Sequence, residues 1–195
     1  MNMITKKIAS LAAMGLLAVT LGACSSDKPA DSSASSSSAA TTEQTSTSTP
    51  EVVSSASVSA DPSVLEKALS ADGNWIIGVT GDVNFDKDLT VAGEFHDKGD
   101  AANDIYRKLA LYAQDADRKV TAEYTITVPQ LVVESENLNI VHGTVKGDVL
   151  VKANGFVLDG ATVTGKVTFE KQEYKDSAKL DQNGAKVEGD VTVSE

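Results

Sequence analysis

Cysteine is nearly absent from this sequence, which has Cys24 as its single copy in 195 residues. A lone cysteine excludes an internal disulfide framework, and no thiol is left downstream of position 24 for catalysis or metal binding. Histidine is also rare, and its two copies, His96 and His142, stand far apart without the spacing of a zinc motif. The sequence therefore predicts no metal site and no cofactor.

Positive charge is in short supply as well. Lysine and arginine total 17 against 28 aspartates and glutamates, which gives a formal net charge of −11. Nucleic acids and anionic lipid surfaces need a positive footprint on the protein, so this balance argues against either as a direct partner. Acidic clusters occur at Asp97, Asp100 and Asp104 and at Asp115 and Asp117, but they lack the spacing and closing glutamate of a calcium loop.

One hydrophobic run stands out, over residues 8–21, and its length of about 14 residues is too short to span a bilayer comfortably. Two lysines precede it and small residues follow it, as in an export signal. The run Leu-Gly-Ala-Cys at residues 21–24 resembles the lipobox of bacterial lipoproteins. The resemblance implies cleavage between Ala23 and Cys24, acylation of Cys24, and anchoring to the outer face of the cell membrane through the lipid.

Glycine and aromatic residues are missing from residues 25–60, which contain 14 serines and 5 threonines. Such a segment cannot bury enough apolar surface to offset its ordering entropy, so we expect it to be disordered. The chain is therefore predicted to have three parts. These are a signal peptide over residues 1–23, the lipidated cysteine and a tether over residues 24–60, and one folded domain over residues 61–195.

A short helix is predicted at the start of this domain, over residues 62–72. Asp61 is a good N-cap and Pro62 suits the first helical position. Gly73 suits the left-handed position that follows a helix. The apolar stripe of this helix consists of Val64, Leu65, Ala68 and Leu69.

The rest of the domain carries an internal repeat of the form Val-x-Gly-[Asp/Lys]-Val-x-[Val/Phe]. Copies start at Val145, Val163 and Val187, which gives intervals of 18 (163 − 145) and 24 (187 − 163), and an early copy starts at Val79. The longer interval includes the charged segment 170–181, which is predicted to be a loop. A fixed period with short strands and glycine corners is typical of a solenoid.

We therefore expect a mostly β fold, a short right-handed parallel β-helix (β-solenoid) with one N-terminal capping helix. The repeated glycine would serve a corner that needs a positive φ or has no room for a Cβ. Asp148, Lys166 and Asp190 would stack in one structural column. A compact antiparallel β-sandwich is the alternative, because strand alternation alone fits both folds.

Residues 96–130 interrupt the repeat and are expected to form a decoration, with a polar loop followed by two strands that run out and back. Tyr106, Tyr112 and Tyr124 are its candidate ligand surface, because aromatic rings can stack on sugar rings. The alternative is that these rings only pack the decoration onto the rest of the fold.

Catalytic motifs are missing too. The sequence has no nucleophile elbow, no zinc-protease helix and no phosphate-binding loop. Asp82, Asp148 and Asp190 lie at repeat positions and suggest a polysaccharide enzyme, but no paired-carboxylate geometry follows from their spacing. We therefore predict a protein that is not an enzyme and has no catalytic residues.

Two wider resemblances concern the folded domain. Residues 74–77 (Asn-Trp-Ile-Ile), 106–112 (Tyr-Arg-Lys-Leu-Ala-Leu-Tyr) and 144–149 (Thr-Val-Lys-Gly-Asp-Val) make it similar to small Gram-positive, clostridial-type lipoproteins of unknown function, which implies no particular activity. The glycine-valine repeats over about residues 126–193 resemble those of bactofilins, short right-handed β-helix proteins that polymerise end to end.

Together these features predict a membrane-anchored, extracytoplasmic lipoprotein that serves as a non-enzymatic structural or binding module. The favoured ligand is cell-wall or other carbohydrate, and nucleic acid is not expected as a partner. Two alternatives remain open at this point, an end-to-end self-assembling solenoid and an envelope polysaccharide-active enzyme.

Overall fold

The structure, a computed structural model, describes residues 56–194. The predicted signal peptide, the lipidation site Cys24 and most of the predicted tether lie outside these residues. Strands dominate the described part, which is therefore mostly β as expected. The strands are β1 (Ala56–Ser59), β2 (Ile76–Val79), β3 (Val83–Asn84), β4 (Leu89–Val91), β5 (Arg107–Ala110), β6 (Tyr112–Gln114), β7 (Val120–Glu123), β8 (Thr125–Val133), β9 (Leu138–Val141), β10 (Thr144–Val151), β11 (Val157–Asp159), β12 (Thr162–Val163), β13 (Val167–Phe169), β14 (Lys179–Gln182), β15 (Lys186–Val187) and β16 (Val191–Val193).

Helices are short and few in this part of the chain. They are α1 (Pro62–Leu69), the 3-10 turn η1 (Asp97–Gly99) and α2 (Gln172–Ser177). Within residues 56–194, no helix combines the length and the apolar character that crossing a membrane would require.

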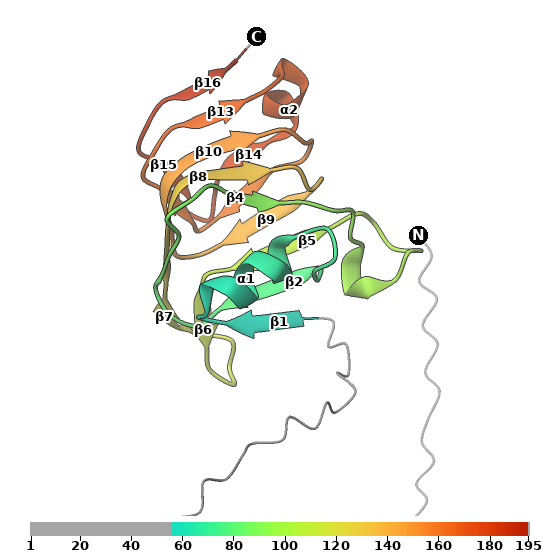
Figure 1. The fold of residues 1–195 in the computed structure, drawn as a ribbon, viewed down its shortest axis with the longest axis vertical. Coiled ribbons are helices and arrows are strands. Elements are labelled where there is room, and N and C mark those ends of the chain that lie inside the picture. Colours follow the sequence, from blue (N-terminus) through green and yellow to red (C-terminus); the bar gives the residue numbers. More distant parts are fainter. Residues whose placement is uncertain (1–55, 195) are drawn as a thin grey trace, which may run out of the picture. The chain divides into compact units, whose positions relative to one another are not determined.

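Most strands belong to two parallel sheets (Figure 1). The first has six strands in the order β1-β2-β5-β9-β11-β14. The second has eight: β8 pairs with β3, β4 and β10, β10 also pairs with β12 and β13, and these two pair with β15 and β16. The chain alternates between the two sheets as it advances, from β9 to β10 to β11 and then to β12 and β13. The parallel pairing excludes the antiparallel sandwich, and only the hairpin β6-β7 is an antiparallel sheet within the described residues.

The sequence repeat sets the strand register. Val145 and Val149 on β10 pair with Val163 and Val167, which occupy the same positions in the next copy of the motif. Val163 in turn pairs with Val187, its equivalent in the last copy, in spite of the longer interval between these two copies. The alignment of the three full copies is therefore confirmed, and equivalent residues of successive copies lie in the same column.

The early copy is the exception. The repeat predicts that Val83 lies in the column of Val149. In the structure Val83 pairs with Ile126, and Ile126 pairs with Val145, so Val83 lies in the column of Val145. The column of Val149 is occupied instead by Leu89, through Leu131. The early motif is therefore out of register with the later ones. Burial decides this register, because a strand must direct its apolar side chains to the core whatever motif it resembles.

The core lies between the two sheets and forms one cluster. Alternating residues of the strands point inward, as in the fully buried Val145, Val149 and Val151 of β10. All members of the cluster lie between Leu65 and Ala185. The described residues fall within one compact unit of the chain. This part of the protein thus has a core of its own and is expected to fold without the preceding residues.

Helix α1 begins as predicted. The Asp61 carboxylate accepts hydrogen bonds from the Ser63 backbone N–H at 2.8 Å and the Val64 N–H at 3.2 Å, and Pro62 stands at the first position. The hydroxyl of Ser63, followed by these N–H groups, holds the pKa of the Asp61 carboxyl below its ordinary value. The cap is therefore ionised at neutral pH.

The end of α1 was predicted less well. The helix stops at Leu69 instead of residue 72, with Ser70 as its C-cap in an extended conformation. Gly73 does not take a left-handed conformation; a Cβ there would lie 1.9 Å from the Ala68 carbonyl oxygen, so close approach explains the glycine. Leu65, Ala68 and Leu69 are buried, but Val64 is 47% exposed and does not join the stripe.

Arg107 ties this helix to the sheets. It is fully buried, and its guanidinium stacks 4.1 Å from the centre of the Phe95 ring. Burial lowers the pKa of Arg107 to about 10, so the side chain stays charged at neutral pH. No carboxylate binds it within residues 56–194. The acceptors of its hydrogen bonds are the carbonyls of Ala68, Ser70, Asn74 and Ala92 and the hydroxyl of Ser135.

Two further predictions need correction. Residues 96–130 are not one decoration, because β5 lies inside the six-stranded sheet and β8 inside the eight-stranded one. Only the loop before β5 and the hairpin β6-β7 project from the sheets. The segment 170–181 is not a plain loop, since it contains α2, whose Tyr174 packs against the core. In both places contacts with the rest of the fold stabilise regular secondary structure that the polar local sequence does not predict.

Candidate binding surface

The strand β5 divides its side chains between the core and the outer face of the six-stranded sheet. Arg107 and Leu109 point inward and are fully buried. Lys108 lies on the outer face, where its register partner on β9 is Asn139. The period of two along a strand places Tyr106 on this same outer face. Tyr112 lies instead at the start of β6, in the hairpin that projects from the sheets.

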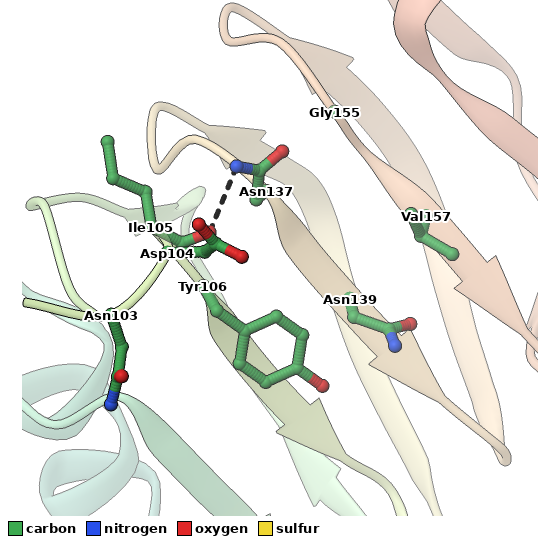
Figure 2. Close-up of a pocket in the computed structure, with 8 residues that line it drawn as sticks. All are labelled: Asn103, Asp104, Ile105, Tyr106, Asn137, Asn139, Gly155 and Val157. Carbon is green, nitrogen blue, oxygen red and sulfur yellow. Dashed lines mark hydrogen bonds between the residues drawn. The ribbon is translucent and has the colours of Figure 1, made fainter. Parts of the chain in front are cut away.

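A pocket of about 710 Å³ opens on this face, at the end of the sheet where β5 and β9 begin (Figure 2). The segment before β5 forms one wall, and residues of β9 and β11 with the turns before them form the other. Figure 2 shows Tyr106, Asn139 and Val157 extending to the same side of the sheet. The lining residues are Asn103, Asp104, Ile105, Tyr106, Asn137, Asn139, Gly155 and Val157.

Asn137 joins the two walls. Its side-chain Nδ2 donates to the carbonyl of Ile105 at 2.9 Å, which is the dashed contact in Figure 2. Gly155 lies next to it in the turn before β11, with a φ of +73°, and a Cβ there would lie 1.9 Å from the Asn137 side-chain oxygen. Glycine is therefore required at this position on two counts, its backbone conformation and its space. The pocket wall is fixed by contacts within the protein.

Two polar atoms beside this pocket are shielded from solvent and unpaired. Within residues 56–194, neither the side-chain oxygen of Asn139 nor the indole nitrogen of Trp75 has a hydrogen-bond partner. Trp75 packs against Tyr106 with their ring centres 6.2 Å apart. Buried polar atoms without partners are rare in folded proteins and need a reason. Here they stand on either side of the one aromatic ring that lines the pocket.

Comparisons with protein-family models, with curated proteins and with solved structures found no match. The chemistry of the pocket therefore follows from its own lining. Asp104 is its one charged residue, and the lining includes no lysine or arginine. Three asparagines supply amide donors and acceptors, and Tyr106, Ile105 and Val157 supply apolar surface. Such a lining suits an uncharged or cationic ligand that carries hydroxyl or amide groups.

The loop that forms the first wall is held by its own polar contacts. Nδ1 of His96 lies 2.7 Å from the Asn103 carbonyl oxygen, and the Asn103 amide donates to the carbonyl of Asp97 at 2.8 Å. His96 therefore contacts the backbone of its own loop. Within the described part of the chain, no group of three or more His, Cys, Asp or Glu side chains could hold a metal ion.

The three candidate tyrosines do not form one platform. Tyr106 lines the pocket, whereas Tyr112 lies on β6 and is not part of the lining. Tyr112 packs edge-on against His142, with ring centres 4.8 Å apart, and the Lys108 ammonium lies 5.5 Å from its ring centre. Tyr124 is half-buried and packs against the core. Of the three, only Tyr106 is placed to contact a ligand in this pocket.

The repeated aspartates have structural partners. Asp82 accepts a hydrogen bond from the Thr125 backbone N–H at 2.8 Å, and Asp148 accepts one from the Lys166 N–H at 3.1 Å. The Lys166 ammonium also lies 3.6 Å from Asp148. The predicted Asp148–Lys166 column is thus seen as a contact between neighbouring strands. Neither aspartate lines the pocket.

Sequence reasoning missed the asparagines of the pocket. One signal was available, because Asn137 and Asn139 stand one interval of the repeat before Gly155 and Val157. Where one copy of the repeat has an asparagine and the equivalent outward position of the next copy has valine, the surface of the two copies differs. Asn139 and Val157 are such a pair. The contribution of the loop before β5 had no such signal.

Proposed function

We propose that this protein is a membrane-anchored, extracytoplasmic lipoprotein whose folded part is a non-enzymatic carbohydrate-binding module. The pocket on the outer face of the six-stranded sheet is the proposed ligand site. The observation that carries this proposal is the combination of the Tyr106 ring with three asparagine side chains in the lining of one pocket.

Sugars match this lining on chemical grounds. A sugar ring offers an apolar face, which stacks on an aromatic ring, and hydroxyl groups, which can donate to and accept from asparagine side-chain amides. Because Asp104 is the charged residue of the lining, we expect neutral glycans, or glycans with free amino groups, to bind better than anionic ones. Hydrolysis of a glycosidic bond commonly uses a pair of carboxyl groups, and this lining includes one.

We also propose that the two sheets are the walls of a short right-handed parallel β-helix of four to five coils, as the repeat predicts. The alternation of the chain between the sheets supports this, as do the in-register columns and the single core between the sheets. In such a fold α1 caps the first coil, and the pocket lies on one lateral face, where successive coils add further polar positions.

Binding can be tested with short chitin oligosaccharides, their de-N-acetylated cationic forms and an anionic polysaccharide, by calorimetry and by the fluorescence of Trp75. The Tyr106→Ala variant is expected to bind the preferred glycan about tenfold more weakly, because it loses a stacking contact of about 1.4 kcal/mol. The matched control is Tyr112→Ala, which removes the same ring at a position outside the pocket and should leave affinity unchanged. Equal losses in both variants, or no binding by the unmodified protein, would remove the pocket as a glycan site.

The anchor has its own test. In the full chain, Cys24→Ser removes the thiol that lipidation needs, so the protein should move from the membrane fraction to the soluble or secreted fraction. Metabolic labelling with a fatty acid should mark the unmodified chain and fail to mark the variant. Ser25→Ala is the control, and it should change neither result. Persistence of the Cys24→Ser protein in the membrane fraction would show that something other than this lipid holds it there.

A further inference from the structure

Three strand edges stand open together at the C-terminal end of the sheets. β14 pairs only with β11, β15 only with β12, and β16 only with β13, within the described residues. Figure 1 shows β16 as the outermost strand beyond β13. An open edge presents unpaired backbone N–H and C=O groups, and proteins normally cover or blunt such edges.

The apolar side chains of this last layer are incompletely covered. Val187, Val191 and Val193 are only partly buried, although they pack against the core. Their register partners one strand further in are fully buried; these are Val163, Val167 and Phe169. The inward positions therefore continue to the last strand, but nothing in residues 56–194 closes the core above them.

The last repeat also contains a hydrogen-bond acceptor without a donor in the described residues, the carboxylate of Asp190. Asp148 accepts a hydrogen bond from the backbone N–H of Lys166, which stands at the same position of the next copy. Asp190 occupies this position in the last copy, directly before Val191, the register partner of Val167. Its carboxylate is exposed and accepts no hydrogen bond within residues 56–194. It is positioned to receive a donor from one more strand.

The opposite end of the sheets is closed. Helix α1 covers the core there with Leu65, Ala68 and Leu69, which are all buried. The Leu69 carbonyl accepts a hydrogen bond from Ala92, directly after the edge strand β4, at 3.0 Å. The core is therefore covered at this end and uncovered at the other, although β1 is an edge strand of the six-stranded sheet here.

We propose that a second copy of this chain covers the open edge, so that β16 of one copy pairs antiparallel with β16 of the other around a two-fold axis at Thr192. Inward residues must face inward residues, and of the registers that allow this, the one centred on Thr192 gives both Val191 and Val193 a valine partner. Val191 then lies opposite Val193 of the second copy, and Asp190 lies opposite Ser194 of the second copy, whose hydroxyl can donate to it. Thr192 then lies opposite Thr192 of the second copy on the outer face. This contact would extend the one within each copy between Thr168 and Thr192, whose hydroxyl oxygens lie 3.4 Å apart.

The product is a closed pair and not a filament. A two-fold interface uses the same patch on both copies, so pairing consumes the patch of each copy and leaves none for a third. This inference does not rest on the proposed carbohydrate site, which lies on a lateral face of the sheet. The similarity of the repeat to polymerising β-helix proteins suggested end-to-end assembly. The present proposal limits this assembly to a dimer formed through the two β16 edges.

Disulfide trapping tests the register. In residues 48–195, which lack Cys24, Thr192→Cys introduces a single thiol whose Cα would lie about 5 Å from that of its counterpart across the axis, within disulfide range. Thr168→Cys is the matched control, since it lies one strand further in and its Cα would be about 14 Å from its counterpart. We expect oxidation to give a covalent dimer with Thr192→Cys and little with Thr168→Cys. Equal yields from the two variants would overturn the proposed register.

Light scattering over a wide concentration range tests the assembly itself. The mass of residues 48–195 should rise from one copy to two and stop there. Thr192→Glu places two carboxylates face to face on the axis and should leave a single copy at every concentration, whereas Thr168→Glu should still form pairs. Both sites are on the outer face, so circular dichroism should show an unchanged fold. The proposal fails if the unmodified protein stays single throughout, if its mass grows past two copies, or if Thr192→Glu still pairs.

Discussion

Replacement of Arg107 by methionine is expected to lower the free energy of unfolding by about 4 kcal/mol. Methionine fills much of the same volume but donates no hydrogen bond. It leaves the carbonyls of Asn74 and Ala92 without a donor from the described residues, whereas those of Ala68 and Ser70 each keep a backbone N–H donor. Each buried acceptor that loses its partner costs about 1 to 3 kcal/mol, although water that enters the site will recover part of this.

The position of Arg107 at the end of α1 adds to this effect. The carbonyls at the C-terminus of a helix carry partial negative charge, which the guanidinium neutralises. Without it, α1 should detach from the sheets before the rest of the fold opens. Hydrogen exchange should therefore show early loss of protection at Leu65 and Leu69, ahead of Val149 and Val167 in the centre of the eight-stranded sheet.

Urea denaturation of residues 48–195 gives the measurement, and Arg107→Lys gives the control. Lysine keeps the charge but not the planar fork or its stacking on Phe95, so it should recover only part of the loss. Because burial lowers the pKa of Arg107 only to about 10, the difference between variants should not change across neutral pH. A methionine variant as stable as the unmodified protein would show that the contacts of Arg107 do not hold α1 in place.

Replacement of Gly147 by alanine is expected to destabilise the fold by about 3 kcal/mol. Gly147 lies in the middle of β10 with a φ of +152°, and a Cβ there would lie 1.8 Å from the Val128 carbonyl oxygen of the neighbouring strand. The obstacle is backbone and not a flexible side chain, so β8 and β10 would have to separate. Because these two strands form the centre of the eight-stranded sheet, the effect should reach the whole core.

Gly184 supplies the matched control for this substitution. Its φ of +83° is also unfavourable for alanine, but no atom lies within 4 Å of the Cβ position. Gly184→Ala should therefore cost only the conformational strain, about 1 kcal/mol. Thermal and urea unfolding of both variants separate the two causes. Equal costs would mean that strand separation at Gly147 is cheap and that backbone conformation alone explains the repeated glycine.

The repeat itself favours close approach as the reason for its glycines. A Cβ on Gly165 would lie 2.3 Å from the Gly147 carbonyl oxygen, and one on Gly189 would lie 2.6 Å from the Gly165 carbonyl carbon. Of the three, only Gly147 has a positive φ. Successive copies therefore stack glycine on glycine, and the space between adjacent backbones leaves no room for a side chain. Sequence reasoning left conformation and space as alternatives, and the stacked geometry selects space.

The sequence by itself determined the features that depend on neighbouring residues or on a constant interval. Asp61 and Pro62 fix the start of α1 because the cap and the fixed φ act within one turn. The interval of the repeat sets the register of β10 on β13, because identical spacing brings like residues into one column. These constraints are local or periodic, so the sequence shows them without knowledge of the fold.

Only the tertiary structure decided the features that join segments of unequal spacing. Arg107 pairs with Leu138 across an interval longer than that of the repeat, because the hairpin β6-β7 is inserted between their strands. This offset brings Tyr106 beside Asn137 and Asn139 and so creates the pocket. Burial of Arg107 depends in the same way on acceptors from separate segments of the chain. An insertion such as β6-β7 changes the interval between paired strands, and the sequence does not show which residues on either side of it pair. The pairing is decided by the packing of the apolar faces of the strands.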